Sequence, residues 1–464
     1  MTSDLTALPA TALLDGYAAK SFSPSEVMQA IAARLERLDP QLNAFCYLDL
    51  EAASAAAAAS SERWAKGAPQ GRLDGVPITI KDVLTSKGWP TLRGSKTVDP
   101  NQPWNEDAPA VARLRDQGAI FFGKTTTPEH GWKGVTDSPL TGITRNPWNR
   151  AMTPGGSSGG ASAAAAACLG PLHFGTDGGG SIRIPAGFTG IVGHKPSFGR
   201  VPAFPSSPFG TVSHIGPMAR TVADAALMLT TIAEPDARDP HSLPYQPMDY
   251  RAELGGDLSG LRVAFSPTLG GHRVDPEIAA LVAAAAAEFS ALGATVEEAE
   301  PDLPDCLPIF TVLWYAGAAF TLSSMDDGQK ALLDPGLRRI AEDGSKIGLF
   351  DYLTANRARE AITRTLGLFH RRYDLLLTPT LPIPAFEAGK ETPSEGGGWV
   401  DWTPFSYPFN LTQQPAASVP CGLTSAGLPA GLQIVGRRYD DRLVLKAADA
   451  FERARGGFAM PDLG

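Results

Sequence analysis

The sequence predicts an α/β protein in which one large, twisted mixed β-sheet is sandwiched between layers of α-helices. Helical segments alternate with short apolar strand segments along the chain, which is the pattern of this class. The 464 residues are 43% hydrophobic and 19% charged, a composition that supplies a large core. A big sheet with helices on both faces can absorb this length, so we expect residues 1–464 to form a single domain.

The clearest helix of the N-terminal part begins at Ser23. The segment Ser23-Pro24-Ser25-Glu26 combines an N-cap serine, a proline at the first helical position and a capping-box glutamate. The apolar stripe of one helical face follows at Val27, Ile31, Leu35 and Leu38. A second, alanine-rich helix is expected from Glu51 to Trp64.

The next part of the chain alternates strands with helices. Residues 75–80 predict a buried strand that ends in Lys81-Asp82, and a helix over 109–117 precedes a strand over 119–122. Two glycine-rich turns, residues 153–160 and 176–183, flank an alanine-rich helical run to Cys168 and the short strand 172–174. A capping box at residues 221–224 opens a helix to about Ile232.

The C-terminal half predicts fewer elements. A strand, a helix and a strand are expected over 261–265, 276–292 and 294–296. Between 301 and 402 only a helix over 355–372 and a strand over 375–377 stand out. Paired strands over 417–421 and 431–435, joined across a Gly/Pro turn, precede a closing helix over 442–454.

Charge and cysteine content exclude several classes of protein. The net charge of −9, without a run of Lys or Arg, argues against nucleic-acid binding. The four cysteines show neither a C-x-x-C motif nor zinc spacing, so we expect reduced thiols and a cytoplasmic protein. Asp4 and the absence of early basic residues do not fit a signal peptide. No apolar run is long enough to span a membrane.

The glycine-rich turn Gly178-Gly179-Gly180-Ser181 has the design of a catalytic serine loop. Successive glycines let the backbone approach a substrate, and backbone N–H groups beside an exposed hydroxyl can hold an oxyanion. A surface turn is the commoner explanation of one such segment. A phosphate cradle is a second alternative, but residues 155–160 lack the Lys-Ser/Thr ending of a P-loop and the spacing of a dinucleotide site.

Lys81 is the candidate base. A serine hydroxyl needs a neighbouring base, and none of the seven histidines lies in a recognisable triad context. Lys81 closes an apolar strand, where burial would lower its pKa toward neutrality. A lysine that extends from the strand end to water is the commoner alternative, and a Schiff-base lysine is a third.

Three segments together resemble the amidase-signature family. They are Gly75 to Asp82, Gly155-Gly156-Ser157-Ser158-Gly159-Gly160, and Thr176 to Ala186. Their order and spacing are similar to those of the family's motifs: Ser157 and Ser181 are 24 positions apart, and Lys81 lies 76 positions before Ser157. Further matches are residues 193–200, Asn410-Leu411-Thr412 and Gly431 to Gly436. The resemblance covers nearly the whole chain, with a signature core over 70–220 and a variable region over 235–400.

The resemblance implies a Ser–cis-Ser–Lys hydrolase. Ser181 would be the acylated nucleophile, Ser157 would relay protons, and a neutral Lys81 would be the ultimate base. The backbone N–H groups of Gly178, Gly179, Gly180 and Ser181 would form the oxyanion hole. The family also implies a cis peptide between Gly156 and Ser157. The residues expected to brace the two turns without direct chemistry are Ser158, Thr176, Asp177 and Arg183.

The resemblance further implies hydrolysis of the carbon–nitrogen bond of a small-molecule amide, without a metal or cofactor. Aromatic and apolar residues near the motifs favour an aryl, alkyl or otherwise hydrophobic amide as substrate. Esters could also be cleaved, because their hydrolysis passes through the same acyl-enzyme. The candidate pocket residues are Trp132, Met152, Trp402 and Phe405, and the region 235–400 would supply the substrate funnel. Homodimers are common in such families.

The runner-up is the glutaminase subunit of a tRNA-dependent amidotransferase. That subunit would need an acidic residue just upstream of the family's Asn-Leu pair to hold glutamine. Trp402-Thr403-Pro404-Phe405 occupies this neighbourhood here, and Asp401 lies out of register. A catalytically dead binding protein is a third alternative, but it would not need Lys81, Ser157 and Ser181 together.

Overall fold

The computed structural model describes residues 4–463, and one mixed sheet organises them. The spatial order of its eleven strands is β1-β3-β2-β6-β8-β7-β12-β13-β11-β9-β10 within these residues. The strands are β1 Phe45–Leu48, β2 Pro77–Lys81, β3 Ile120–Thr125, β6 Leu172–Asp177, β7 Val192–Lys195, β8 His214–Ala219, β9 Arg262–Phe265, β10 Thr295–Glu298, β11 Leu375–Pro379, β12 Ala416–Leu423 and β13 Pro429–Gly436. A separate hairpin pairs β4 Asp137–Ser138 with β5 Gly142–Ile143.

The sheet is mixed because parallel pairs interrupt antiparallel ones. β2 is parallel to β3 and β6, and β9 is parallel to β10 and β11. The centre is antiparallel, from β6 through β8, β7 and β12 to β13 and β11. The predicted pairing of the two C-terminal strands is confirmed, with Ser418 opposite Gln433.

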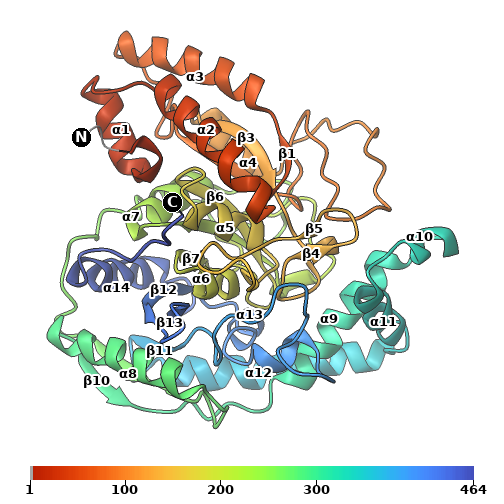
Figure 1. Ribbon diagram of the computed structural model, residues 1–464. Coiled ribbons are helices and arrows are strands. Elements are labelled where there is room, and N and C mark those ends of the chain that lie inside the picture. The colour runs from red at the N-terminus through yellow and green to blue at the C-terminus, as the bar shows by residue number, and fades with distance from the viewer. Residues whose placement is uncertain (1–3, 464) are drawn as a thin grey trace.

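Helices cover both faces of the sheet (Figure 1). One core joins the sheet to α4 Pro109–Asp116, α7 Val222–Ile232, α8 Pro276–Ala291 and α14 Asp441–Ala454. The N-terminal helices pack beside β1 and β3 in a second core, with α1 Ala10–Ala18, α2 Pro24–Leu42, α3 Leu50–Ala65 and α5 Gly159–Ala166. The predicted α/β sandwich is therefore confirmed.

A third core lies on the side of the molecule that carries the variable region. It contains α6 Arg183–Thr189, α9 Leu307–Leu322, α11 Pro335–Gly344, α12 Leu349–Phe369 and α13 Pro408–Leu411. In Figure 1, α9, α10 Asp327–Ala331 and α11 extend from one side of the sheet, and α12 runs beneath β11 and α13. Short 3₁₀ helices lie at Leu5–Ala7, Glu129–Gly131, Gly210–Val212 and Trp399–Trp402.

Helix starts follow the cap chemistry, with two departures from prediction. The Ser23–Glu26 capping box is confirmed, because Glu26 accepts the Ser23 N–H at 2.8 Å. At α7, Thr221 caps the Asp224 N–H, but the Asp224 carboxylate instead accepts the N–H groups of Ala10 and Thr11, so no reciprocal box forms. α12 begins at Leu349 rather than at 355, because Asp351 caps the N–H of Gly348.

No helix within residues 4–463 has the length and apolar character needed to cross a membrane.

Candidate active site

Lys81 lies at the end of β2 with its ammonium nitrogen among three hydroxyl groups. Lys81 Nζ is 2.7 Å from Ser157 Oγ, 2.9 Å from Ser158 Oγ and 2.9 Å from Thr176 Oγ1. The strands β2 and β6 are parallel neighbours, so Lys81 and Thr176 leave the sheet at the same edge. Ser157 and Ser158 come from the glycine-rich turn that opens α5.

Burial sets the charge state of Lys81. The side chain is 0% exposed, and desolvation lowers its pKa well below the ordinary value, although the attraction of Asp177 opposes this shift. Within residues 4–463 no carboxylate forms an ion pair or hydrogen bond with Lys81 Nζ. The surroundings therefore favour the neutral amine, the form that can accept a proton.

The peptide between Gly156 and Ser157 is cis, as the family resemblance implied. The backbone is closely packed here, since a Cβ on Gly156 would lie 2.5 Å from the Val135 carbonyl oxygen. Gly131 approaches the opposite side of Ser157, because a Cβ there would lie 3.3 Å from Ser157 Oγ. Backbone therefore packs closely on Gly156 and near the Ser157 hydroxyl, which contacts Lys81 Nζ.

Ser181 follows the glycine turn that ends β6, and it joins the two signature turns. Its carbonyl oxygen accepts the Ser158 N–H at 3.2 Å. The Ser181 hydroxyl makes no hydrogen bond within the described part of the chain, and the N–H groups of Gly178, Gly179 and Ser181 likewise have no acceptor there. These hydroxyl and N–H groups therefore have no hydrogen-bond partner within residues 4–463.

Gly180 departs from the predicted oxyanion set. Its N–H donates to Asp177 Oδ1 at 2.7 Å and is therefore already engaged. The carboxylate holds this N–H because Asp177 turns back over its own loop and also accepts the Ile182 N–H at 3.3 Å. The predicted oxyanion donors are thus reduced to three in this conformation.

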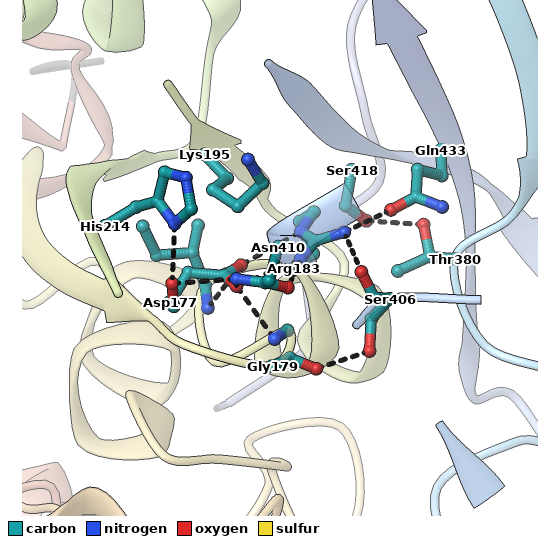
Figure 2. Close-up of polar contacts among 12 residues, drawn as sticks. Asp177, Gly179, Arg183, Lys195, His214, Thr380, Ser406, Asn410, Ser418 and Gln433 are labelled. Carbon is teal, nitrogen blue, oxygen red and sulfur yellow. Dashed lines mark hydrogen bonds and ion pairs between the residues drawn. The ribbon is translucent and has the colours of Figure 1, made fainter. Parts of the chain in front are cut away.

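Asp177 and Arg183 form a buried brace behind the loop (Figure 2). Arg183 Nε and Nη2 each donate to the Asp177 carboxylate at 2.9 Å. Burial alone would raise the pKa of Asp177, but the Arg183 guanidinium and the surrounding donors hold it below its usual range. The carboxylate therefore stays charged and keeps the glycine turn fixed.

Three residues that were not predicted as site residues complete this brace. Asn410 Nδ2 donates to the Asp177 carbonyl at 2.9 Å and to its carboxylate at 2.8 Å. Gln433 Oε1 accepts from Arg183 at 2.8 Å, and Ser406 Oγ donates to the Gly179 carbonyl at 2.6 Å. The sequence signal for Gln433 was its position as the one polar side chain in the apolar strand segment Gly431 to Val435.

Ser158 and Thr176 lie closer to the candidate base than expected. Both hydroxyls contact Lys81 Nζ directly, in addition to joining the two turns. Ser158 Oγ donates in turn to the Thr176 carbonyl oxygen at 3.2 Å. The two residues therefore fix the position of the amine.

Aromatic side chains from the variable region pack on the glycine turn. A Cβ on Gly179 would lie 2.6 Å from Phe310 Cζ and 2.8 Å from Trp399 Cη2, and one on Gly178 would lie 2.8 Å from Trp314 Cζ3. Phe310 and Trp314 are stacked, with ring centroids 5.4 Å apart. This aromatic wall consists of Phe310, Trp314 and Trp399, all buried.

Of the four candidate pocket residues, Trp132 contacts this wall by a hydrogen bond, and the other three have different neighbours. The Trp132 carbonyl accepts the Trp314 indole N–H at 3.0 Å, and Trp402 stacks on Phe188 with centroids 5.8 Å apart. Phe405 lies edge-on to His272, with centroids 6.0 Å apart, and Met152 bridges to the backbone of Glu387. These contacts make Trp132 and Trp402 part of the same buried aromatic core as the wall.

Comparison with known proteins decides the family. A family model described as Amidase matches residues 26–445. This chain is a member of the amidase family. It is 40% identical over 457 residues to an acylamidase of Rhodococcus erythropolis, covering 97% of this chain and 95% of the relative. It is also 37% identical to a glutamyl-tRNA(Gln) amidotransferase subunit of Myxococcus xanthus, covering 97% of each chain.

The fold of this amidase agrees with the same assignment. The structure of a bacterial aryl acylamidase of the amidase-signature family matches it with a TM-score of 0.90 and 31% identity, over 96% of both chains. The predicted family and the predicted class of enzyme, a hydrolase of carbon–nitrogen amide bonds, are both confirmed.

Proposed function

We propose that this amidase hydrolyses hydrophobic aryl or alkyl amides through an acyl-enzyme on Ser181, with Ser157 as proton relay and Lys81 as base. The observation that carries the proposal is the buried Lys81 amine with three hydroxyl contacts and no carboxylate partner within residues 4–463. A neutral amine has two N–H donors and one lone pair. Ser158 and Thr176 take the two N–H groups, which leaves the lone pair for the Ser157 proton.

The proton path follows from this arrangement. Lys81 accepts the Ser157 proton while Ser157 accepts the Ser181 proton, and Ser181 Oγ attacks the substrate carbonyl. The tetrahedral oxyanion binds the free N–H groups of Gly178, Gly179 and Ser181. When the carbon–nitrogen bond breaks, the proton held by Lys81 returns through Ser157 to the leaving amine. A water molecule then attacks the acyl-enzyme, with Ser157 and Lys81 again taking its proton, and the carboxylic acid leaves Ser181.

The aromatic wall supports a hydrophobic substrate. Phe310 and Trp399 lie against Gly179, so the first groups beyond the reacting carbonyl would meet aromatic rings. The acylamidase and aryl acylamidase relatives support the same class. α9, which carries Phe310 and Trp314, lies in the 235–400 region, and this supports a role of that region in shaping the substrate path.

Within residues 4–463, the neighbourhood of Trp402 does not offer the free acidic residue that a glutamine site would need. Asp401, the nearest acidic residue to the wall in sequence, is exposed and caps its own 3₁₀ turn through the Gly398 N–H at 2.7 Å. Its carboxylate is therefore engaged in local structure. The thiols of Cys46, Cys168, Cys306 and Cys421 are all free, which supports action in the reducing cytoplasm.

Labelling the nucleophile tests the proposal. The protein is incubated with a fluorophosphonate and its intact mass is measured beside Ser181→Ala and the control Ser162→Ala, which removes a buried hydroxyl bonded only to its own helix turn. We expect one adduct on the parent and on Ser162→Ala, and none on Ser181→Ala. An adduct that survives Ser181→Ala would overturn the assignment.

The substrate class needs its own assay. Release of 4-nitroaniline from 4-nitroacetanilide is compared with ammonia release from glutamine under the same conditions. We expect turnover of the anilide with an initial burst of the aniline, and no turnover of glutamine. Glutamine hydrolysis without anilide turnover would transfer the assignment to the amidotransferase glutaminase.

A further inference from the structure

A basic groove lies between α12 and the segment 411–414, which directly follows Asn410. It consists of two adjoining cavities of about 440 and 470 Å³. Both are lined by Thr363 of α12, Thr412 and Arg438. The combined size fits a small ligand rather than a single ion.

The groove concentrates positive charge on a protein whose net charge is −9. Five arginines line it and only one carboxylate, that of Glu360, does so among the described residues. The arginines are Arg359, Arg364, Arg371, Arg437 and Arg438. Like charges that converge without partners repel one another, so this arrangement favours an anion between them.

Most of these guanidinium groups have no carboxylate partner in the described part of the chain. Arg437 pairs with Asp374 at 2.5 Å, and Arg359 is bound to the Leu411 carbonyl and the Thr211 hydroxyl. Arg364, Arg371 and Arg438 form no ion pair within residues 4–463, and Arg438 only stacks 4.8 Å over the Tyr439 ring. Their forked N–H groups are free to bind a multi-oxygen anion.

A buried histidine supplies a second, independent indication of a ligand. His370 is 4% exposed and lines the first cavity. Its Nδ1–H donates to the Tyr373 carbonyl at 3.2 Å, while Nε2 is buried without a hydrogen-bond partner among residues 4–463. Because burial lowers the pKa of His370 to about 4, Nε2 carries a lone pair at neutral pH. Because His370 lines the cavity, this unpaired nitrogen can accept an O–H or N–H from a ligand bound there.

We propose that this groove binds a small ligand through a phosphate group, held by Arg371 and Arg438 in the cavity that His370 also lines, while His370 Nε2 accepts an O–H of the ligand. Two unpaired guanidinium groups lining one cavity suit the tetrahedral, multiply charged phosphate better than a single carboxylate, which one arginine can satisfy. Free phosphate and a phosphate monoester share this chemistry. A protonated phosphate oxygen or a neighbouring hydroxyl supplies the O–H that His370 accepts.

The site would be connected to the catalytic brace. Arg359 Nε and Nη2 donate to the Leu411 carbonyl at 3.1 and 2.9 Å. Leu411 follows Asn410, which holds Asp177. A phosphate that neutralises the groove would therefore act on the segment that positions the glycine turn.

Isothermal titration calorimetry of the full-length protein tests the proposal at pH 7 and constant 100 mM NaCl. Inorganic phosphate and glycerol 3-phosphate are titrated separately, with additional NaCl as the control for ionic strength. We expect saturable one-site binding of at least one phosphate. Stronger binding of glycerol 3-phosphate would identify a monoester as the ligand, and equal binding would identify free phosphate. Heats that match those of added NaCl would overturn the site.

Four variants assign the binding to this groove. Arg371→Gln and Arg438→Gln should each weaken binding about tenfold or more, the size of one charge-assisted contact. His370→Asn keeps a donor for Tyr373 and removes the acceptor at Nε2, so it should also weaken binding. Arg72→Gln, which removes an exposed arginine remote from the groove, should bind as the parent does. Equal binding by Arg371→Gln, Arg438→Gln and the parent would overturn the proposal.

Discussion

The ends of β2 and β3 each bury a lysine, and the two differ only in their partners. Lys81 and Lys124 are both 0% exposed and lie on neighbouring strands. Lys81 contacts hydroxyl groups alone, whereas Lys124 Nζ lies 3.3 Å from the Asp82 carboxylate and donates to two backbone carbonyls. Burial lowers the pKa of both lysines, and the attraction of a carboxylate opposes each shift. Asp177 acts on Lys81 without an ion pair to it, whereas Asp82 contacts Lys124 Nζ directly.

This contrast supports the proposal that partner chemistry, added to burial, separates the proposed base Lys81 from the structural cation Lys124. Asp82 also accepts the N–H groups of Leu92 and Gly94, so the pair with Lys124 holds the loop that follows β2. The hydroxyl groups around Lys81 carry no charge that would balance an ammonium group, although two of them belong to the turn that opens α5. We therefore expect the two lysines to respond in opposite ways to the same substitution.

Lys81→Met should lower kcat roughly 10⁴-fold without lowering the free energy of unfolding. Burial makes the pKa of Lys81 lower in the folded protein than in the unfolded chain. Such a lysine lowers the free energy of unfolding at pH values below its pKa in the unfolded chain, and this cost fades as the pH rises toward that pKa. Methionine removes the cost. Anilide hydrolysis and urea denaturation at pH 7 measure the two effects. A variant that unfolds more easily and retains catalysis would reverse the comparison.

Lys124→Met should lower the free energy of unfolding by about 3–5 kcal/mol, because it leaves Asp82 buried without a cation. The matched control is Lys66→Met, which removes an exposed lysine paired with Glu62 and should change stability by less than about 0.5 kcal/mol. Urea denaturation compares the two variants. Equal stability would mean that the buried pair contributes nothing to holding the loop.

The pH dependence of catalysis should report the charge of Lys81. In the proposed mechanism the neutral amine is the active form, so kcat/KM should rise with pH through the depressed pKa of Lys81 and stay high at neutral to alkaline pH. Below that pKa the rate should fall about tenfold per pH unit. Rates between pH 5 and 9, with circular dichroism to confirm folding, give the profile. A maximum in acid would contradict a lysine base.

Asn410→Ala should lower kcat about 10²-fold with little change in KM. The substitution removes the contacts to the carbonyl and carboxylate of Asp177, so the glycine turn loses its fixed position, and small displacements at a reacting centre cost this much. Gln413→Ala is the control, since its amide binds only the Thr211 carbonyl. Steady-state kinetics with the anilide separate kcat from KM.

The sequence predicted the parts of the site that lie in contiguous motifs. Lys81 and Ser181 could be proposed because each belongs to a short segment whose residue types suit a base or a nucleophile, whereas the role of Ser157 came from the resemblance to the family. Asn410 and Gln433 could not be assigned a role, because their contacts to Asp177 and Arg183 join residues 233 and 250 positions apart. Spacing within a motif carries no information about such pairs.

The variable region was predicted least well. α9 is apolar on all sides, so it shows no amphipathic stripe, and its burial becomes visible only when α11 and α12 pack on it. α10 and α11 did carry start signals, in the capping box of Asp326 with Gln329 and in Asp334 before Pro335. The contact of Phe310 with the glycine turn follows from this long-range packing alone.

Phe310→Ala tests whether the variable region sets specificity, with the smallest expected effect. Its ring lies against Gly179, so removal should open space beside the acyl carbon and lower the preference for 4-nitroacetanilide over acetamide about tenfold. Phe320→Ala changes the same helix at a side chain that is 70% exposed and should leave the preference unchanged. The ratio of kcat/KM values measures it. An unchanged ratio in Phe310→Ala would place the determinant of specificity outside α9, and the aromatic wall would then serve only to pack the glycine turn.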